Sequence, residues 1–301
     1  MPVRRRLLLL AFSLLVPAVI ACGIAVLFTY SHERQRSEEN LLRTAQALAE
    51  SVDRELDSIV LRLQALATSP SLQSGDMQAF WQQASQAVRE DGMWVVLITQ
   101  GGQQVLNTLK PFGEPLPHHT VESSIGHVVE HIFSRKSPSV SDVFTGPVTG
   151  KPTLGIAVPV TGRNGEILYS LFMGILPSAL KNVVSSASLP KEWLAAAFDT
   201  QPVIVARSRD PEPYIGTAPV PALVQAMASS ATGIINANSR EGQPTRVAYS
   251  RSPKYGWYFA VGVPKAELAA AVFQTILLFL AIALALLTIG AVLALGFGRS
   301  L

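Results

Sequence analysis

Charged residues are scarce in this chain and are missing from most of both ends. Only 15% of the 301 residues are Asp, Glu, Lys or Arg, against about 25% in an ordinary soluble domain. No charged residue occurs between Leu7 and Tyr30, or between Leu268 and Gly298. Each run exceeds the roughly 20 apolar residues that cross a bilayer. The sequence therefore predicts two transmembrane helices, over residues 7–30 and 268–298.

The basic excess is confined to the outer flanks of these two runs. The net charge is +3, but Arg4 to Arg6 and Arg299 lie outside residues 31–267, which hold 20 basic and 21 acidic residues. Basic flanks of this kind place residues 1–6 and 299–301 in the cytoplasm. We therefore expect a two-pass protein of the bacterial inner (plasma) membrane whose residues 31–267 are periplasmic. Its balanced charge gives no reason to expect a nucleic-acid partner.

Cysteine is almost absent, because Cys22 is the single one. It lies inside the first apolar run, which excludes a disulfide framework and thiol catalysis. Residues 19–22, Val-Ile-Ala-Cys, also resemble a lipoprotein cleavage box behind a basic start. Cleavage there would leave an apolar terminus, and the apolar run continues through Phe28. We favour an uncleaved anchor, with cleavage as the alternative.

Glycine and proline are absent from residues 33–68, which predicts one long helix. Apolar residues recur there at alternating steps of three and four from Leu41 to Leu66. This spacing is typical of a coiled-coil-like seam. We expect a signalling and dimerisation helix over residues 31–70 and a parallel homodimer along the seam. The alternative is that the helix buries this stripe against its own domain, and both can hold, since a long helix can pack on its domain and on a second copy.

The rest of the chain reads as two copies of one pattern. The first copy contains, in order, a helix over 77–89, strands over 94–99 and 104–108, a helix over 121–133, and strands over 153–160 and 166–174. About 100 residues later come a strand pair within 195–208, a helix over 222–229, and strands over 233–238, 245–250 and 257–262. Such a repeat indicates two modules of the same architecture. The predicted fold class is α+β, with two antiparallel sheets on a long N-terminal helix.

The order of these parts resembles the double Cache sensor family of bacterial membrane receptors. The motifs that carry the resemblance are VSDVFTGPV (140–148), AVPV (157–160), LPKEW (189–193), IVARS (204–208) and AYSRS (248–252) with Gly256-Trp257. The resemblance implies two tandem PAS-like modules, a membrane-distal one over residues 71–185 and a membrane-proximal one over 186–267. It also implies a small-molecule ligand in the distal module, signalling through the second span, and a homodimer. The variant is most similar to the outer part of sensor histidine kinases in two-component systems.

The chain departs from the family pattern at one informative place. Family members that bind amino acids carry an Arg-x-Trp-Tyr element after the first hairpin, and the corresponding stretch here is FGEPLPHH (112–119). The resemblance therefore does not imply an amino-acid ligand. The 301 residues also contain no phospho-acceptor His motif, ATP-binding module or G-x-S-x-G element. We expect a sensor without enzymatic activity or cofactor; the alternative is a membrane-anchored structural or assembly protein that binds a partner protein.

The expected ligand site lies between the first sheet and the segments that cover it, residues 110–120 and 134–152. These segments and the adjoining strand mix carboxylate, hydroxyl, amide and aromatic side chains around a flexible glycine, as a site for a small polar ligand requires. The residues predicted to contact the ligand are Asn107, His119, Asp142, Phe144, Thr145 and Lys151. Lys151 would suit a carboxylate group.

The stretch His127-Val-Val-Glu130-His131 matches the inverted zinc-protease pattern H-x-x-E-H. Two histidines four residues apart share one face of a helix and can hold zinc, with the glutamate as base. The repeat leaves no room for a protease fold, so we interpret the stretch as a solvated helix face. Reversible metal binding by His127 and His131 is the weaker alternative, and no resident metal is predicted.

Overall fold

The structure, a computed structural model, describes residues 3–88, 92–186 and 189–268, with isolated positions between 277 and 288. The chain divides into two compact units, residues 1–41 with 263–301 and residues 42–262. The larger unit carries the two β-sheets, and its architecture is what positions the candidate site.

The described residues contain no helix that is both long and apolar enough to cross a membrane. The span predicted over residues 7–30 lies within a helix, but most of its side chains are outside the described ones. Nearly all of the span predicted over residues 268–298 lies outside the described residues as well. Both spans therefore stay predictions from the sequence.

Helix α1 runs from Val3 to Ala67 without interruption, which confirms the long helix. Its seam faces inward, and no seam residue from 45 to 66 is more than 8% exposed: Ala45, Leu48, Val52, Leu56, Ile59, Leu63 and Leu66. Because the chain itself covers these side chains, they cannot also pack against a second copy. The prediction of dimerisation along this seam is wrong, and the alternative, burial against the helix's own domain, is what the structure shows.

The first sheet follows two short helices, α2 (Pro70–Ser74) and α3 (Met77–Ala87). Its strands are β1 (Met93–Ile98), β2 (Gln104–Asn107), β3 (Ser139–Val140), β4 (Phe144–Thr145), β5 (Pro152–Thr161) and β6 (Ile167–Ile175). They lie in the order β2-β1-β6-β5-β3, and β4 pairs separately with β5. Helix α4 (Ser124–Arg135) is capped at its N-terminus by Ser123, whose hydroxyl accepts from the Gly126 N–H at 3.0 Å.

The second sheet has the same order as the first. After α5 (Pro177–Ser186) come β7 (Leu194–Phe198), β8 (Ile204–Arg207), α6 (Pro221–Ser229), β9 (Thr232–Asn238), β10 (Pro244–Arg251) and β11 (Tyr258–Pro264). The strands lie in the order β8-β7-β11-β10-β9. The two strand orders are equivalent when β7 is matched to β1, β8 to β2, β11 to β6 and β10 to β5. The predicted repeat and α+β class are therefore confirmed; α2, α5, β3 and β4 were not predicted.

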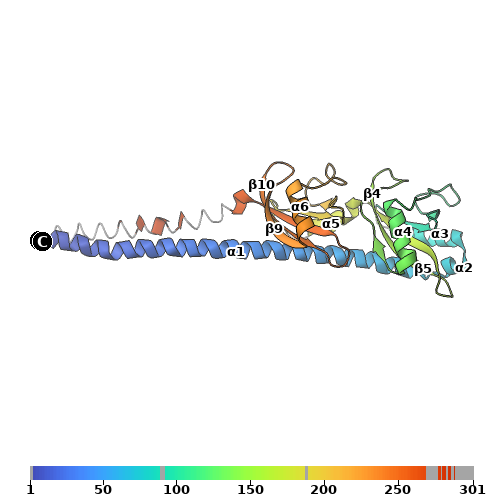
Figure 1. Cartoon of the computed structure of the whole chain (residues 1–301), viewed down its shortest axis with the longest axis horizontal. Helices are drawn as coiled ribbons and strands as arrows, with labels where there is room; N and C mark the ends of the chain where they lie inside the picture. Colours follow the sequence, from blue (N-terminus) through green and yellow to red (C-terminus); the bar gives the residue numbers. More distant parts are fainter. Residues whose placement is uncertain are drawn as a thin grey trace. The chain divides into compact units, whose positions relative to one another are not determined.

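Each sheet packs helices on both of its faces. On the first sheet, Met93 and Met173 line one groove with Arg62 and Leu66 of α1. The opposite face, to which β1 contributes the alternate side chains, packs against α4 and forms the second hydrophobic layer. Figure 1 shows both sheets beside the residues of α1 that belong to this unit. The candidate site lies in the α4 layer.

Candidate functional site

A small cavity lies between the first sheet and the segments on its α4 face. Strand residues of β1, β2, β5 and β6 form its wall, and Ile125 of α4 and residues 144–149 cover it. Its volume is about 30 Å³, which is room for roughly two water molecules. A larger ligand therefore requires the cover to move outward. Residues 146–149 belong to no helix or strand and form the irregular part of the cover.

Three buried polar side chains meet at the β2 side of this cavity. The Asn107 Nδ2 donates to Gln104 Oε1 at 3.0 Å, and Gln104 Nε2 lies 2.8 Å from His119 Nε2. Because an amide N–H can only donate, His119 Nε2 accepts and its proton is on Nδ1. Gln104 and Asn107 each keep a second amide N–H that the network does not use. These N–H groups are available to a hydrogen-bond acceptor on a ligand.

The lining of the cavity carries no formal charge. Burial, together with the neighbouring His118, lowers the pKa of His119, so its imidazole is neutral near pH 7. No Asp, Glu, Lys or Arg is among the described residues that line the cavity. The polar groups that remain are amides, the hydroxyls of Thr149 and Thr153, and the imidazole. Such a site can recognise hydrogen-bonding patterns but cannot neutralise an ionic group.

The floor of the cavity is an indole ring that rests on bare backbone. Trp94 of β1 pairs in register with Gly174 of β6, and Gly174 pairs with Gly155 of β5. A Cβ at Gly174 would lie 2.2 Å from Trp94 Cε2, so only glycine leaves room for the ring. Phe172 and Phe144 extend this apolar surface. The cavity lining thus combines an aromatic surface with the amide groups.

The covering turn, residues 146–151, is held by its own hydrogen bonds. The Gly146 N–H donates to the Lys151 carbonyl at 2.9 Å, and the Gly150 N–H donates to the Gly146 carbonyl at 2.8 Å. A Cβ at Gly146 would lie 2.4 Å from Thr149 Oγ1 and 2.7 Å from Thr153 Oγ1. The glycine thus lets the two hydroxyls approach the backbone at the cavity wall.

The structure separates the six residues that the sequence assigned to the site. Asn107, His119 and Phe144 line the cavity. Thr145 is exposed beside it, and Lys151 is exposed at the end of the covering turn. Asp142 lies two residues before Phe144 but points to the second sheet, as described below. A ligand role for all six stays a prediction.

Four further residues line the cavity without being among the predicted ligand contacts: Gln104, Trp94, Thr149 and Thr153. The sequence places Gln104 and Trp94 on the strands of the first hairpin. Their position in the site could have been predicted from the alternation of side chains along a strand. This alternation places Trp94 and Gln104 on the same face of the sheet as Ile98. The contribution of Thr149 and Thr153 could not be read from the sequence, because it depends on how the covering turn folds back.

Two carboxylates join the cover to the second sheet. Asp142 Oδ1 accepts from the Thr200 N–H at 2.9 Å and from the Thr200 hydroxyl at 2.8 Å. In return, Asp199 Oδ2 accepts from the Val143 N–H at 3.0 Å. Asp199 is fully buried, and burial raises its pKa although three backbone N–H groups oppose that effect. The β7–β8 turn is therefore attached directly to the segment that covers the cavity.

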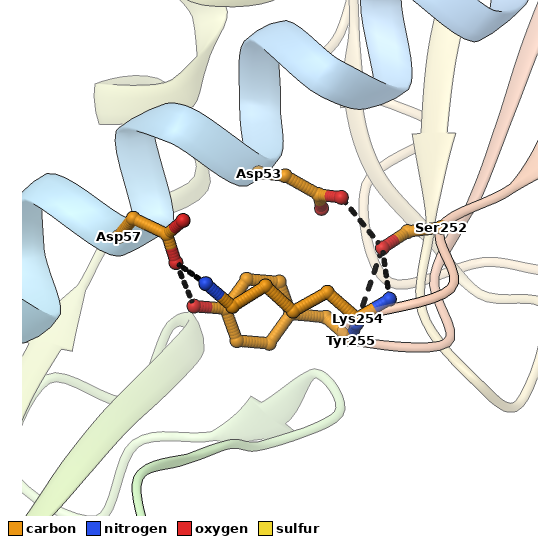
Figure 2. Close-up of polar contacts among 5 residues, drawn as sticks. All are labelled: Asp53, Asp57, Ser252, Lys254 and Tyr255. Atoms are coloured by element: carbon orange, nitrogen blue, oxygen red, sulfur yellow. Dashed lines mark hydrogen bonds and ion pairs between the residues drawn. The ribbon is translucent and has the colours of Figure 1, made fainter.

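A second polar contact joins α1 to the loop between β10 and β11 (Figure 2). Asp57 accepts from Lys254 Nζ and from the Tyr255 hydroxyl, each at 2.5 Å. One turn earlier, Asp53 accepts from the Ser252 hydroxyl at 2.8 Å. Hydrogen bonds from Lys254 and Tyr255 lower the pKa of Asp57, whereas burial raises that of Asp53. Strand β11 begins directly after this loop, so the contact fixes the start of β11 relative to α1.

Metal binding by His127 and His131 of α4 stays a prediction. The described residues contain no cluster of three or more His, Cys, Asp or Glu side chains that could hold a metal ion. His131 lies 3.1 Å from the Ser137 hydroxyl, a contact that the solvated-face interpretation allows. His127 and His131 remain only the weak alternative that the sequence suggested.

Comparison with known proteins gives matches at the level of structure alone. No family model matches the chain, and no curated protein matches its sequence. Among solved structures, the ligand-binding domain of the Pseudomonas aeruginosa PAO1 amino-acid chemoreceptor PctB, in complex with L-Arg, is 14% identical. The alignment covers 78% of this chain and 97% of that one, with a TM-score of 0.60.

Two further structures agree with this match. The ligand-binding domain of the Pseudomonas fluorescens chemoreceptor CtaA, in complex with L-isoleucine, is 14% identical over 81% of this chain and 98% of that one, with a TM-score of 0.59. The extracellular domain of rpHK1S-Z16, a proposed histidine kinase, is 12% identical over 79% and 97%, with a TM-score of 0.58. The chain has the fold of a Cache-type sensor domain.

This sensor fold bears on the functional alternatives. Two of these structures are ligand-binding domains of chemoreceptors and the third is the extracellular domain of a proposed histidine kinase, and none of the three is described as a catalytic domain. The fold agrees with a sensor and with the expectation of a periplasmic segment. The alternative of a structural or assembly protein gains no support from it.

Proposed function

We propose that this chain is the periplasmic input part of a sensor-kinase-type receptor in the bacterial inner membrane. Residues 7–30 and 268–298 are its two spans, and the chain between them holds a membrane-distal module (71–185) and a membrane-proximal module (186–267). The support for the spans is the absence of charge from both runs and the arginines on their outer flanks. A reporter enzyme fused at Gly92 should be active only as an exported protein; activity confined to the cytoplasm would contradict this topology.

The ligand that we propose is a small, uncharged molecule with hydrogen-bonding groups on one edge and an apolar face. The observation that carries this proposal is the uncharged polar lining of the cavity, which combines the amide groups of Gln104 and Asn107 with the aromatic surface of Trp94. A zwitterionic amino acid would bury two charges without partners there, which is strongly unfavourable. This ligand class differs from the amino acids bound in the PctB and CtaA structures.

The proposed signal begins with outward movement of the covering residues. These residues continue directly from Asp142 and Val143, whose hydrogen bonds reach the β7–β8 turn of the proximal module. Displacement of the cover therefore pulls on this turn and on β7, which pairs with β11. Strand β11 is the last element before the second predicted span.

Homodimerisation remains part of the proposal but needs a surface other than the buried seam. The outward face of α1 carries Arg43, Glu50, Arg54 and Leu61, all exposed, and Leu61 is 65% exposed. Disulfide crosslinking of Arg54→Cys or Leu61→Cys in membranes should give a dimer if this face pairs. Crosslinking at neither position would exclude it.

A thermal-shift screen of the full chain in detergent tests the proposed ligand class. The library should contain uncharged amides, diols and heterocycles alongside amino acids. A ligand at a hundredfold excess over its dissociation constant stabilises the folded state by about 2.7 kcal/mol. Asn107→Ala and Gln104→Ala should remove the shift, while Arg163→Ala, in the exposed turn between β5 and β6, should keep it. A screen in which only charged amino acids stabilise the protein would contradict the proposal.

A further inference from the structure

The second sheet contains a buried cation at the position that lines the cavity in the first sheet. In the first hairpin, Val96 pairs with Asn107 and Ile98 with Gln104, with a bulge between them. In the second, Ala196 pairs with Arg207 and Phe198 with Ile204, with the same bulge. Arg207 therefore occupies the register position of Asn107. It faces the layer formed with α6, which corresponds to the α4 layer that holds the cavity.

The environment of Arg207 is that of an anion-binding group. Its side chain is 3% exposed, and its guanidinium carbon lies 4.1 Å from the centre of the Tyr214 ring, so the ring supports the charge by a cation–π contact. Arg240 approaches the same ring at 5.6 Å and adds positive potential. Arg207 Nη1 is buried without a hydrogen-bond partner. The Nη1 group of Arg207 is thus a hydrogen-bond donor for which the described residues supply no acceptor.

The carboxylate that Arg207 does bind comes from an exposed turn. Arg207 Nη2 donates to Glu241 Oε1 at 2.5 Å, and the Glu241 side chain is 40% exposed. Glu241 lies in the turn between β9 and β10, where Gly242 has a φ of +81°. A single-oxygen contact uses only half of the fork that a guanidinium offers to a carboxylate. A carboxylate that bound both terminal nitrogens of Arg207 would therefore interact with it more strongly than Glu241 does.

We propose that the proximal module carries a second binding site, for a small monocarboxylate, in which Arg207 is the anchoring cation and Glu241 is a displaceable internal occupant. A buried arginine without any anion is strongly unfavourable, so Glu241 leaves only when another carboxylate takes its place. A free carboxylate can engage both Nη1 and Nη2, which Glu241 does not. Its departure releases the β9–β10 turn, and the site is therefore coupled to the conformation of that hairpin.

Acetate and propionate are the probes, used on the full chain in detergent with sodium chloride at matched ionic strength. Binding is measured by equilibrium dialysis of the radiolabelled acid. Wild type should bind weakly, because Glu241 competes. Glu241→Ala should bind about tenfold more tightly, since the fraction of open sites limits apparent affinity. Glu212→Ala, which removes an exposed acid from the same module, should bind as wild type does, and propionamide should not compete.

Two further variants assign the binding to this site. Arg207→Met in the Glu241→Ala background should abolish binding; if it does not fold, Arg207→Lys keeps the charge, lacks the bidentate fork and should weaken binding. Asn107→Ala should leave carboxylate binding unchanged, because its cavity is separate. Absence of binding to Glu241→Ala would overturn the proposal. A second result would also overturn the proposal: the Glu241→Ala variant binds the acid, but wild type does not bind it even at a hundredfold higher concentration of the acid. Glu241 would then be a permanent partner of Arg207.

Discussion

Asp142 and Asp199 each accept a backbone N–H from the segment that carries the other, Asp142 from Thr200 and Asp199 from Val143. The exchange joins the segment that covers the cavity to the β7–β8 turn. Asp199 holds its own turn as well, through the Gln201 and Val203 N–H groups at 3.0 and 2.8 Å. One buried carboxylate therefore both shapes a turn of the second sheet and attaches it to the first.

Asp199→Ala should lower the free energy of unfolding by roughly 1–3 kcal/mol, because it leaves backbone N–H groups without their acceptor. Urea denaturation of the full chain in detergent, followed by tryptophan fluorescence, measures the change. Glu122→Ala, an exposed acid at the start of α4, should change it by less than about 0.5 kcal/mol. Equal effects of the two substitutions would show that the Asp199 hydrogen bonds do not stabilise the fold.

Gly174→Ala should destabilise the protein by about 1–3 kcal/mol, because its methyl group would collide with the Trp94 ring. Combining it with Trp94→Leu, which removes the ring, should restore part of the loss in a double-mutant cycle. Gly165→Ala tests a different glycine, at a turn with a φ of +81° and no neighbour within reach. Its cost should not depend on Trp94. An additive Gly174–Trp94 cycle would contradict the close contact.

Tyr255→Phe should reduce stability by about 1 kcal/mol, since it removes the hydroxyl that donates to Asp57. Lys254→Met should have a smaller effect: this ion pair is solvent-exposed, and exposed pairs contribute little. Chemical denaturation of both variants, alone and with Asp57→Ala, measures the coupling. The Tyr255 effect should largely disappear in the Asp57→Ala background, which has no side-chain acceptor for the hydroxyl. Persistence of the full effect would assign it to packing of the ring instead.

Acid should weaken the Arg207–Glu241 pair within a defined pH range. Burial acts to raise the pKa of Glu241, but the hydrogen bonds from Arg207 and Ser239 prevail and lower it from 4.5 to about 2. A folded-state pKa below the unfolded one means that the stabilisation is complete above about pH 4.5 and is lost as the pH falls towards 2. Glu241→Gln should therefore show a smaller decrease in stability across that range. Denaturation curves at successive pH values compare the two proteins.

The sequence determined the secondary structure and its repetition, because these depend on local patterns. Residues 33–68 lack any helix breaker, and the recurring strand and turn pattern predicted the longer strands and their repetition, although not the order of the strands within each sheet. The seam from Leu41 to Leu66 showed which side of α1 is apolar. It could not show which surface covers that side, since a partner helix and the protein's own sheets bury apolar side chains equally well. Only the tertiary structure decided in favour of the sheets.

The same distinction applies to the site. Asn107, His119 and Phe144 line the cavity because strand alternation and the covering segment, both legible in the sequence, place them there. Asp142 lies only two residues from Phe144, yet it turns to Thr200, a residue far away in the sequence. Arg207 and Asn107 share one register position, but the first is closed by Glu241 and the second faces a cavity. These outcomes depend on which side chains meet after folding, and that is set by packing between segments that the sequence does not place next to each other.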